Sequence, residues 1–408
     1  MAKITEVSPL APSSFPDLPV IEGVEFAAIE AGVRYQGRKD VMLARLVPGT
    51  AMTGVFTKSS TRSAPVLDCQ EKIGNDSEEG AAIIVNAGNA NAFTGRNGME
   101  ATAAVTGAVA ECLDLPNDRV FSSSTGVIGE ALPHDRITSK LSDLKGALDQ
   151  GAVRDAAEAI RTTDTFPKGA GTEVEIDGKP VRIAGIAKGS GMVAPDMATM
   201  LVYIFTDAKI GRADLQTMLT ELTNLTFNNI TVDSDTSTSD TLLLAATGAS
   251  GVDVTGNNAF RDALFKVMLD LAHQVVRDGE GATKFVEVKV TGARSDADAR
   301  THALAIANSP LVKTAVAGED PNWGRVVMAI GKSGAEADRD LLTIRFGDVL
   351  VAENGWVSPD YREEDGATYM KQQELGITVD LGLGSGQSTV WTCDLTHGYI
   401  TINADYRS

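Results

Sequence analysis

The sequence predicts a mixed α/β protein built from layers of strands and helices. Short apolar runs typical of buried strands alternate with longer stretches whose apolar residues recur at helical spacing. Several strand-like runs also follow one another without a helix between them, which argues against a regular doubly wound sheet. The 408 residues are enough for two or more domains or for one large α/β unit.

In the first half of the chain, β-like segments separated by glycine turns predict the early strands. An uninterrupted apolar run at 81–85 predicts a buried strand, which leads into a loop rich in amide side chains at 86–95. A further strand begins at Val120 and runs into a series of hydroxyl residues and glycine. The predicted strands here are 24–26, 41–47, 51–56, 81–85 and one from 120, and the predicted helices are 98–113, 135–151 and 152–161.

In the second half, the apolar run 200–205 predicts another buried strand. Segment 258–276 predicts an amphipathic helix, because its apolar residues recur three and four positions apart. The remaining predicted helices are 212–225 and 303–317, and the remaining strands are 241–246, 285–290, 326–330, 342–346, 377–381 and 390–393.

Composition and charge exclude several classes of function. The formal charge of −19 argues against binding to nucleic acid or to anionic membrane surfaces. Three scattered cysteines and four histidines show no metal-ligand spacing, so no metal is expected and a reducing compartment fits. The N-terminus lacks the apolar core of a signal peptide, and no apolar run approaches the ~20 residues that span a bilayer. We therefore expect a cytoplasmic protein.

Segment 188–205 joins a glycine-rich loop to an apolar strand, with Ala198 and Thr199 at the junction. On one reading, Thr199 is simply a β-former that opens a strand. On the other, the loop strains the Ala198–Thr199 peptide, and the Thr199 hydroxyl attacks the preceding carbonyl. Hydrolysis of the resulting ester would free Thr199 as a new N-terminus. Its α-amine, with a pKa of about 8, could then deprotonate its own hydroxyl.

The junction is one of seven segments that resemble, in the same order, the ornithine acetyltransferase (glutamate N-acetyltransferase) family of arginine biosynthesis. The resemblance extends along nearly the whole chain and favours the second reading of Thr199. The other six segments are 86–95, 124–129, 162–168, 233–240, 278–284 and 320–325.

The resemblance implies a precursor that cleaves itself between Ala198 and Thr199. The products would be an α chain, 1–198, and a β chain, 199–408, which stay together in a heterotetramer of two α and two β chains. The implied fold is a layered α/β/β/α sandwich with mixed sheets, similar to N-terminal-nucleophile hydrolases but different in connectivity. No metal or bound organic cofactor is implied.

The implied chemistry is a ping-pong transfer of acetyl from N2-acetylornithine to glutamate through an acetyl ester of Thr199. Thr125 and Gly126 match the oxyanion hole of the family. Lys188 is the natural partner for a substrate carboxylate and Glu280 for an ammonium group. The other matches to substrate-binding positions are Thr162, Asn403 and Ser408. The sequence leaves open whether acetyl-CoA is a second acetyl donor.

Other functions remain open at this point. A self-cleaving threonine amidase or aminopeptidase would have similar catalytic residues but would pass the acyl group to water. A binding protein for amino-acid-like ligands could use Lys188 and Glu280 without cleavage. Without the resemblance, both charges would be interpreted as solvated loop residues. A phosphate loop at 188–191 is disfavoured, because the glycines precede a strand and not a helix N-terminus.

Overall fold

The computed structural model describes residues 6–194 and 200–404, and the chain divides into two units. The larger unit comprises 12–228 and 235–275, and the smaller unit comprises 1–11, 229–234 and 276–408. Ala198, Thr199 and Ser408, which the sequence singles out, lie outside the described residues. No helix in the described ranges is long and apolar enough to cross a membrane.

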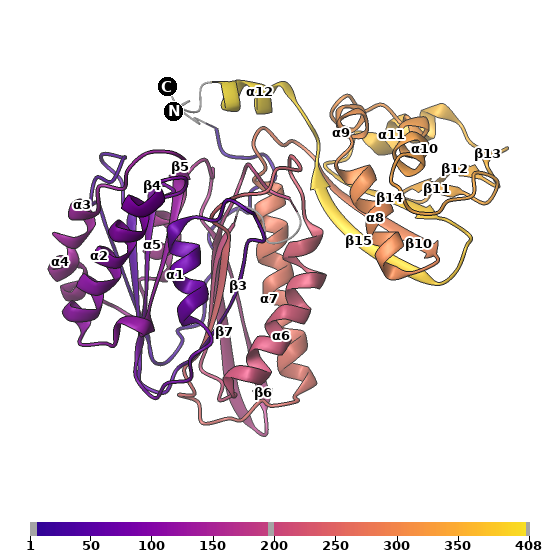
Figure 1. The fold of residues 1–408 in the computed structure, drawn as a ribbon. Helices are drawn as coiled ribbons and strands as arrows, with labels where there is room; N and C mark the ends of the chain where they lie inside the picture. The colour runs from indigo at the N-terminus through magenta and orange to yellow at the C-terminus, as the bar shows by residue number, and fades with distance from the viewer. Residues whose placement is uncertain (1–5, 195–199, 405–408) are drawn as a thin grey trace. The chain divides into compact units, whose positions relative to one another are not determined.

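The larger unit contains two β-sheets (Figure 1). The first has the order β1-β2-β4-β5, in which β4 and β5 are parallel and the other pairs antiparallel. The second has the order β3-β9-β8-β7-β6, in which only β8 and β9 are parallel. The strands are β1 (Val24–Ile29), β2 (Val41–Leu46), β3 (Ala51–Phe56), β4 (Ala81–Asn89), β5 (Val120–Val127), β6 (Lys168–Ile176), β7 (Lys179–Lys188), β8 (Leu201–Thr206) and β9 (Thr241–Ala246).

A hydrophobic core joins the two sheets, with Met42, Ile83 and Phe121 from the first and Ile186 and Tyr203 from the second. A second core lies between the outer face of the first sheet and helices α2, α3 and α4. Helices α6 and α7 lie on the other side of the second sheet (Figure 1). The helices are α1 (Ala64–Lys72), α2 (Gly95–Leu113), α3 (His134–Thr138), α4 (Leu141–Gly146), α5 (Val153–Ala159), α6 (Arg212–Leu225) and α7 (Asn258–Arg277). The predicted α/β/β/α layering is confirmed in this unit.

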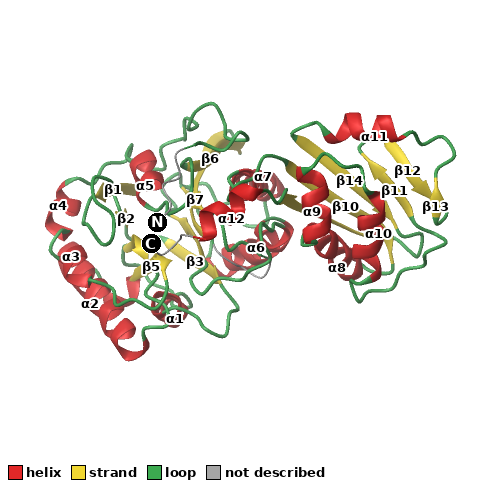
Figure 2. Ribbon diagram, turned by 90° about the horizontal axis from the view of Figure 1, so that it is seen from above, coloured by secondary structure: helices red, strands yellow, loops and turns green. Residues whose placement is uncertain are grey.

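The smaller unit is built on one six-stranded mixed sheet with the order β13-β12-β11-β14-β10-β15. Its core lies between one face of this sheet and four helices, three of which, α8, α9 and α10, are seen beside it in Figure 2. The elements are β10 (Phe285–Ala293), α8 (Asp296–Ala307), α9 (Pro310–Ala317), α10 (Trp323–Gly331), β11 (Thr343–Phe346), β12 (Val349–Glu353), β13 (Trp356–Val357), α11 (Glu363–Met370), β14 (Glu374–Asp380), β15 (Gly386–Cys393) and α12 (His397–Ala404).

One predicted strand is wrong: residues 326–330 belong to helix α10. A run of five apolar residues fits either structure, and burial decides between them. Val326, Ala329 and Ile330 are buried at helical spacing, whereas Met328 is exposed. The single helices predicted at 135–151 and 303–317 are each interrupted. The second breaks before Pro310, which starts α9 because proline fits the first turn of a helix.

The strands on either side of the predicted cleavage position are neighbours in one sheet. β7 ends at Lys188, and β8 begins at Leu201 directly opposite it in the antiparallel pairing. β9 pairs with the other edge of β8, so β8 lies inside the second sheet. The register therefore places Lys188 across from the start of the strand that follows the junction.

Candidate active site

The end of β5 has a geometry that only glycine can adopt. Gly126 has a φ of +130°, and a Cβ at this position would lie 2.3 Å from the carbonyl carbon of Gly88 in β4. The β4–β5 pairing is irregular here, because Asn89 pairs with both Thr125 and Val127. Such bulges change the direction of the neighbouring backbone and side chains. Thr125 itself is buried.

Lys188 and Thr125 meet between the two sheets. The Lys188 ammonium group donates a hydrogen bond to the Thr125 hydroxyl oxygen over 3.3 Å, and both side chains are buried. Lysine can only donate, so Thr125 accepts in this contact and retains its own hydroxyl hydrogen for another partner. Two of the predicted active-site residues, which are 63 positions apart in the sequence, are thus in direct contact.

A buried carboxylate, Asp164, lies beside this pair. Its side chain is fully buried and accepts hydrogen bonds from Lys168 Nζ (2.6 Å), from the Gly189 amide (2.7 Å) and from the Thr162 amide (3.0 Å). Burial by itself would raise the pKa of Asp164. The charges of Lys168 and Lys188 and the hydrogen bonds outweigh it and hold this pKa well below its usual range. Asp164 is therefore the anion that balances the buried lysines.

Asp240, the residue before β9, is a second buried carboxylate, and its pKa is shifted in the opposite direction. It is 1% exposed. Burial raises the pKa of Asp240 well above its ordinary value, and the Met200 amide, the Lys188 charge and the Ser237 hydroxyl offset this only in part. Asp240 is therefore a candidate for a neutral carboxylic acid near the start of β8.

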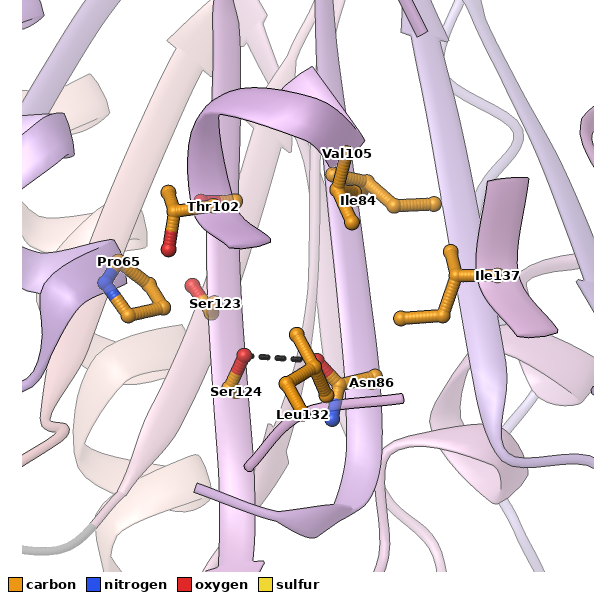
Figure 3. Close-up of a pocket in the computed structure, with 10 residues that line it drawn as sticks. Pro65, Ile84, Asn86, Thr102, Val105, Ser123, Ser124, Leu132 and Ile137 are labelled. Carbon is orange, nitrogen blue, oxygen red and sulfur yellow. Dashed lines mark hydrogen bonds between the residues drawn. The ribbon is translucent and has the colours of Figure 1, made fainter. Parts of the chain in front are cut away.

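Asparagine side chains at the end of β4 fix the end of β5 through hydrogen bonds. The Ser124 hydroxyl donates to Asn86 Oδ1 over 2.6 Å, and Figure 3 shows these two side chains pointing toward each other. The Asn86 amide group also donates to the Asn89 carbonyl (2.9 Å), and Asn89 donates to the carbonyl of Ala131 (3.2 Å). Asn86 and Ser124 also line a cavity of about 10 Å³, which is roughly the space of one water molecule. Asn86 and Asn89 therefore have a structural role beside Thr125, and they belong to β4, which extends four residues beyond its predicted end at 85.

In the smaller unit, the structure brings together Glu280 and Asn403. The Asn403 side-chain amide donates to Glu280 Oε2 over 2.7 Å and also to the Tyr399 carbonyl in α12. The turn at Glu280 and Gly281 is closely packed against α12, because a Cβ on Gly281 would lie 2.4 Å from the Tyr399 amide nitrogen. Asn403 thus orients a nearly buried carboxylate, as expected for a group that would bind an ammonium ion.

The predicted site residues consequently form two groups. Thr125, Gly126, Lys188 and Thr162 belong to the larger unit, where Thr162 contributes a backbone hydrogen bond to Asp164. Glu280 and Asn403 belong to the smaller unit. Within the described ranges, no cluster of three or more histidine, cysteine or acidic side chains could hold a metal ion.

Asp164, Lys168 and Asp240 are functional candidates that the sequence alone does not reveal. All three lie in segments that carried the family resemblance, 162–168 and 233–240. The spacing of Asp164 and Lys168, four residues apart, was the available signal for an ion pair. The local sequence does not predict their burial, because it is rich in polar residues typical of a surface loop.

Known proteins similar to this chain share one family. The sequence model of the ArgJ family matches residues 25–408. The "Arginine biosynthesis bifunctional protein ArgJ" of Ruegeria pomeroyi is 72% identical over 408 residues and covers all of both chains. The protein with the same name from Gluconobacter oxydans is 55% identical over all of this chain and 97% of its own. The solved structure of arginine biosynthesis bifunctional protein ArgJ from Bacillus halodurans is 41% identical, with a TM-score of 0.48, and covers 50% of this chain and 99% of that one. The chain belongs to the ArgJ family.

Proposed function

We propose that this protein is a self-cleaving ornithine acetyltransferase of arginine biosynthesis, which moves acetyl from N2-acetylornithine to glutamate. Membership of the ArgJ family and the names of its close relatives support this reaction class. The Lys188–Thr125 contact supports the assignment of the site, because it lies opposite the start of the strand that follows Thr199. The protein acts in the cytoplasm and requires no metal or bound organic cofactor.

Maturation in this proposal cuts the Ala198–Thr199 peptide. The Thr199 hydroxyl attacks the Ala198 carbonyl carbon, and the amide bond breaks as the ester forms. Water then releases Ala198 as a carboxylate and leaves Thr199 with a free α-amine. The products, 1–198 and 199–408, remain associated, because β8 of the second chain is hydrogen-bonded to β7 of the first. Two copies of this pair form the proposed heterotetramer.

In the first half-reaction, the α-amine of Thr199 takes the hydroxyl proton, directly or through water, as the oxygen attacks the acetyl carbonyl. The C–N bond of N2-acetylornithine breaks, and the proton passes to the departing amine of ornithine. In the second half-reaction, the α-amine of glutamate attacks the acetyl ester. The C–O bond breaks, N-acetylglutamate leaves, and the Thr199 hydroxyl is restored.

Thr125 and Gly126 are the proposed oxyanion donors for both half-reactions. The single observation that carries this assignment is the hydrogen bond from Lys188 to the Thr125 hydroxyl oxygen. This bond occupies Thr125 as an acceptor and leaves its O–H free to donate to a developing negative charge. A nearby ammonium group also favours that charge.

The substrate residues follow from the shared chemistry of ornithine and glutamate, which both carry an α-amine and an α-carboxylate. Glu280, oriented by Asn403, is the proposed partner of a substrate ammonium group. Lys188 is the proposed partner of the carboxylate, alongside its contact with Thr125. Thr162 and Ser408 complete the proposed set. The second activity of the bifunctional enzyme, in this proposal, takes acetyl from acetyl-CoA: the C–S bond breaks, and the thiol leaves with the hydroxyl proton.

The family match disfavours a threonine amidase or aminopeptidase, and one experiment separates the two reactions. The purified enzyme is given N2-acetylornithine with and without glutamate, and ornithine, acetate and N-acetylglutamate are quantified. A transferase releases ornithine at a rate that depends on glutamate, with one N-acetylglutamate formed per ornithine. Release at the same rate without glutamate, with acetate as the product, would identify a hydrolase.

A further inference from the structure

An open groove of about 330 Å³ lies where the first turns of α1 and α2 approach each other in the larger unit. Its walls include Arg62, Leu67, Phe93 and Met99. This volume is in the usual range for small-molecule sites, which are mainly apolar with a few polar groups. We refer to it as the Phe93 groove, and none of its lining residues belongs to the site described above.

Phe93 combines an exposed aromatic side chain with a left-handed backbone conformation. Its side chain is 82% exposed, and its backbone has a φ of +55°. A bulky residue in the left-handed region costs free energy, and an aromatic ring left in water forgoes the gain of burial. Strained residues of this kind concentrate at ligand sites, where a bound molecule uses the displayed group. An exposed planar ring at the edge of a groove is suited to stacking against a nucleobase.

One of the residues that line the groove, Arg62, is cationic and none of them is acidic, although the protein as a whole has a formal charge of −19. Arg96 follows the lining residue Gly95 and Glu100 follows the lining residue Met99, and Arg62 donates a hydrogen bond to Gln70 Oε1 over 3.1 Å. The carboxylate that follows Leu67, Asp68, is paired with Lys72 over 2.8 Å. This local excess of cations complements an anionic ligand.

The groove also adjoins the proposed oxyanion donors. The Ala90 amide donates to the Val127 carbonyl over 3.0 Å, and the Gly129 amide donates to the Ala92 carbonyl over 3.0 Å. The segment that carries Phe93 is thus hydrogen-bonded to the segment that follows Gly126. Gly129 is three positions after Gly126, which is at most about 11 Å of extended chain. A ligand with a long flexible arm can therefore occupy the groove and reach Thr125.

We propose that the Phe93 groove binds the nucleotide end of acetyl-CoA. The Phe93 ring stacks on the adenine, Arg62 and Arg96 face the phosphates, and the pantetheine arm extends to the oxyanion donors. An aromatic platform, nearby arginines and a short path to the reacting carbonyl match the three parts of this molecule. This inference rests on the acetyl-CoA-dependent activity proposed above and assigns that activity a binding site.

The test compares three acetyl donors, with glutamate as the acceptor: acetyl-CoA, N2-acetylornithine and S-acetyl-N-acetylcysteamine, a thioester without the nucleotide. Phe93→Asn removes the ring, and asparagine tolerates the left-handed backbone. We expect the KM for acetyl-CoA to rise about tenfold relative to the KM for each of the other donors. Phe93→Tyr restores the ring and the low KM. The double variant Arg62→Gln, Arg96→Gln raises the same KM and weakens its dependence on salt.

Two matched substitutions elsewhere in the larger unit serve as controls. Leu225→Ala removes an apolar side chain that is 47% exposed at the end of α6, and Lys266→Gln removes an exposed charge in α7. We expect neither substitution to change the ratio of the KM for acetyl-CoA to the KM for each of the other donors.

Equal KM values for acetyl-CoA in the unaltered enzyme and the groove variants would overturn the groove assignment. The proposed acetyl-CoA-dependent activity would be unaffected by that result. An equal rise for both thioesters would also overturn it, because the effect would not depend on the nucleotide. An unaltered enzyme that uses N2-acetylornithine but not acetyl-CoA would instead contradict the second activity itself, and the groove assignment with it.

Discussion

Four charged side chains are packed at the meeting point of the two sheets: Asp164, Lys168, Lys188 and Asp240. All are at least 96% buried except Asp164, whose residue is 7% exposed although its side chain is fully covered. Burying a charged side chain costs free energy unless an opposite charge is paired with it. We therefore expect the arrangement of these four side chains to serve a function. Lys188 provides one, because it contacts Thr125 and orients the hydroxyl that we assign to the oxyanion hole.

Thr125 is the residue whose removal tests that assignment. Thr125→Ala should lower kcat for acetyl transfer about 10²- to 10³-fold, as for the loss of one oxyanion donor. Thr125→Ser retains the hydroxyl and should recover most of the rate. The measurement is steady-state transfer from N2-acetylornithine to glutamate. If Thr125→Ala transferred acetyl at the full rate, Thr125 would have no place in the hole.

The two buried carboxylates should respond oppositely to the same substitution. The folded-state pKa of Asp164 is depressed, so its stabilisation is present above the ordinary pKa of about 4 and is lost as the pH falls toward the folded value. The pKa of Asp240 is raised, so its contribution is favourable at low pH and is lost as the pH rises through the folded value. At neutral pH, Asp164 is therefore stabilising and an ionised Asp240 is not.

Asp164→Asn should accordingly destabilise the fold at pH 7 by about 3 kcal/mol or more, because it leaves buried lysines without their partner. Asp240→Asn should be neutral or stabilising at pH 7, and its advantage should shrink toward pH 4. Thermal unfolding of both variants between pH 4 and pH 8 measures this. A loss of stability at pH 7 as large for Asp240→Asn as for Asp164→Asn would refute the contrast.

At the scale of elements, the parallel pair β4–β5 and the loop that follows β4 position Thr125 and Gly126, the proposed oxyanion donors. Gly126→Ala should therefore disrupt this pair, since the added Cβ would overlap the backbone of Gly88. We expect loss of transfer activity and a thermal midpoint lowered by several degrees. Gly107→Ala in α2 is the control, because nothing lies within 4 Å of the added Cβ and alanine favours a helix. Similar midpoints in the two variants would contradict the close-packing argument.

Elements with strong periodicity could be predicted from the sequence, and those defined by tertiary contacts could not. The amphipathic pattern of 258–276 and the apolar run of 200–205 correspond to α7 and β8. The apolar run 326–330 fits a strand as well as a helix, and only the buried face of α10 distinguishes them. In the site, glycine and hydroxyl residues at the end of β5 were visible as a motif. The burial of Asp164 and Asp240 was not, because distant segments create it.

For the whole molecule, the second sheet connects the proposed maturation to a stable product. β8 lies between β7 and β9, so it is hydrogen-bonded to strands from both predicted chains. Breaking one peptide before β8 leaves these ladders and the core between the sheets in place. The proposed cleavage would therefore generate a new N-terminus at residue 199 without requiring the two chains to separate.

The central claim is that Thr199 becomes an N-terminal nucleophile, and intact mass under denaturing conditions tests it most directly. We predict two fragments of 198 and 210 residues, the second beginning with Thr199, which elute together under native conditions. The variant Thr199→Ala should remain a single inactive chain of 42.8 kDa. An unaltered enzyme that transfers acetyl as one uncut chain, or a Thr199→Ala variant that is cleaved and active, would contradict the account.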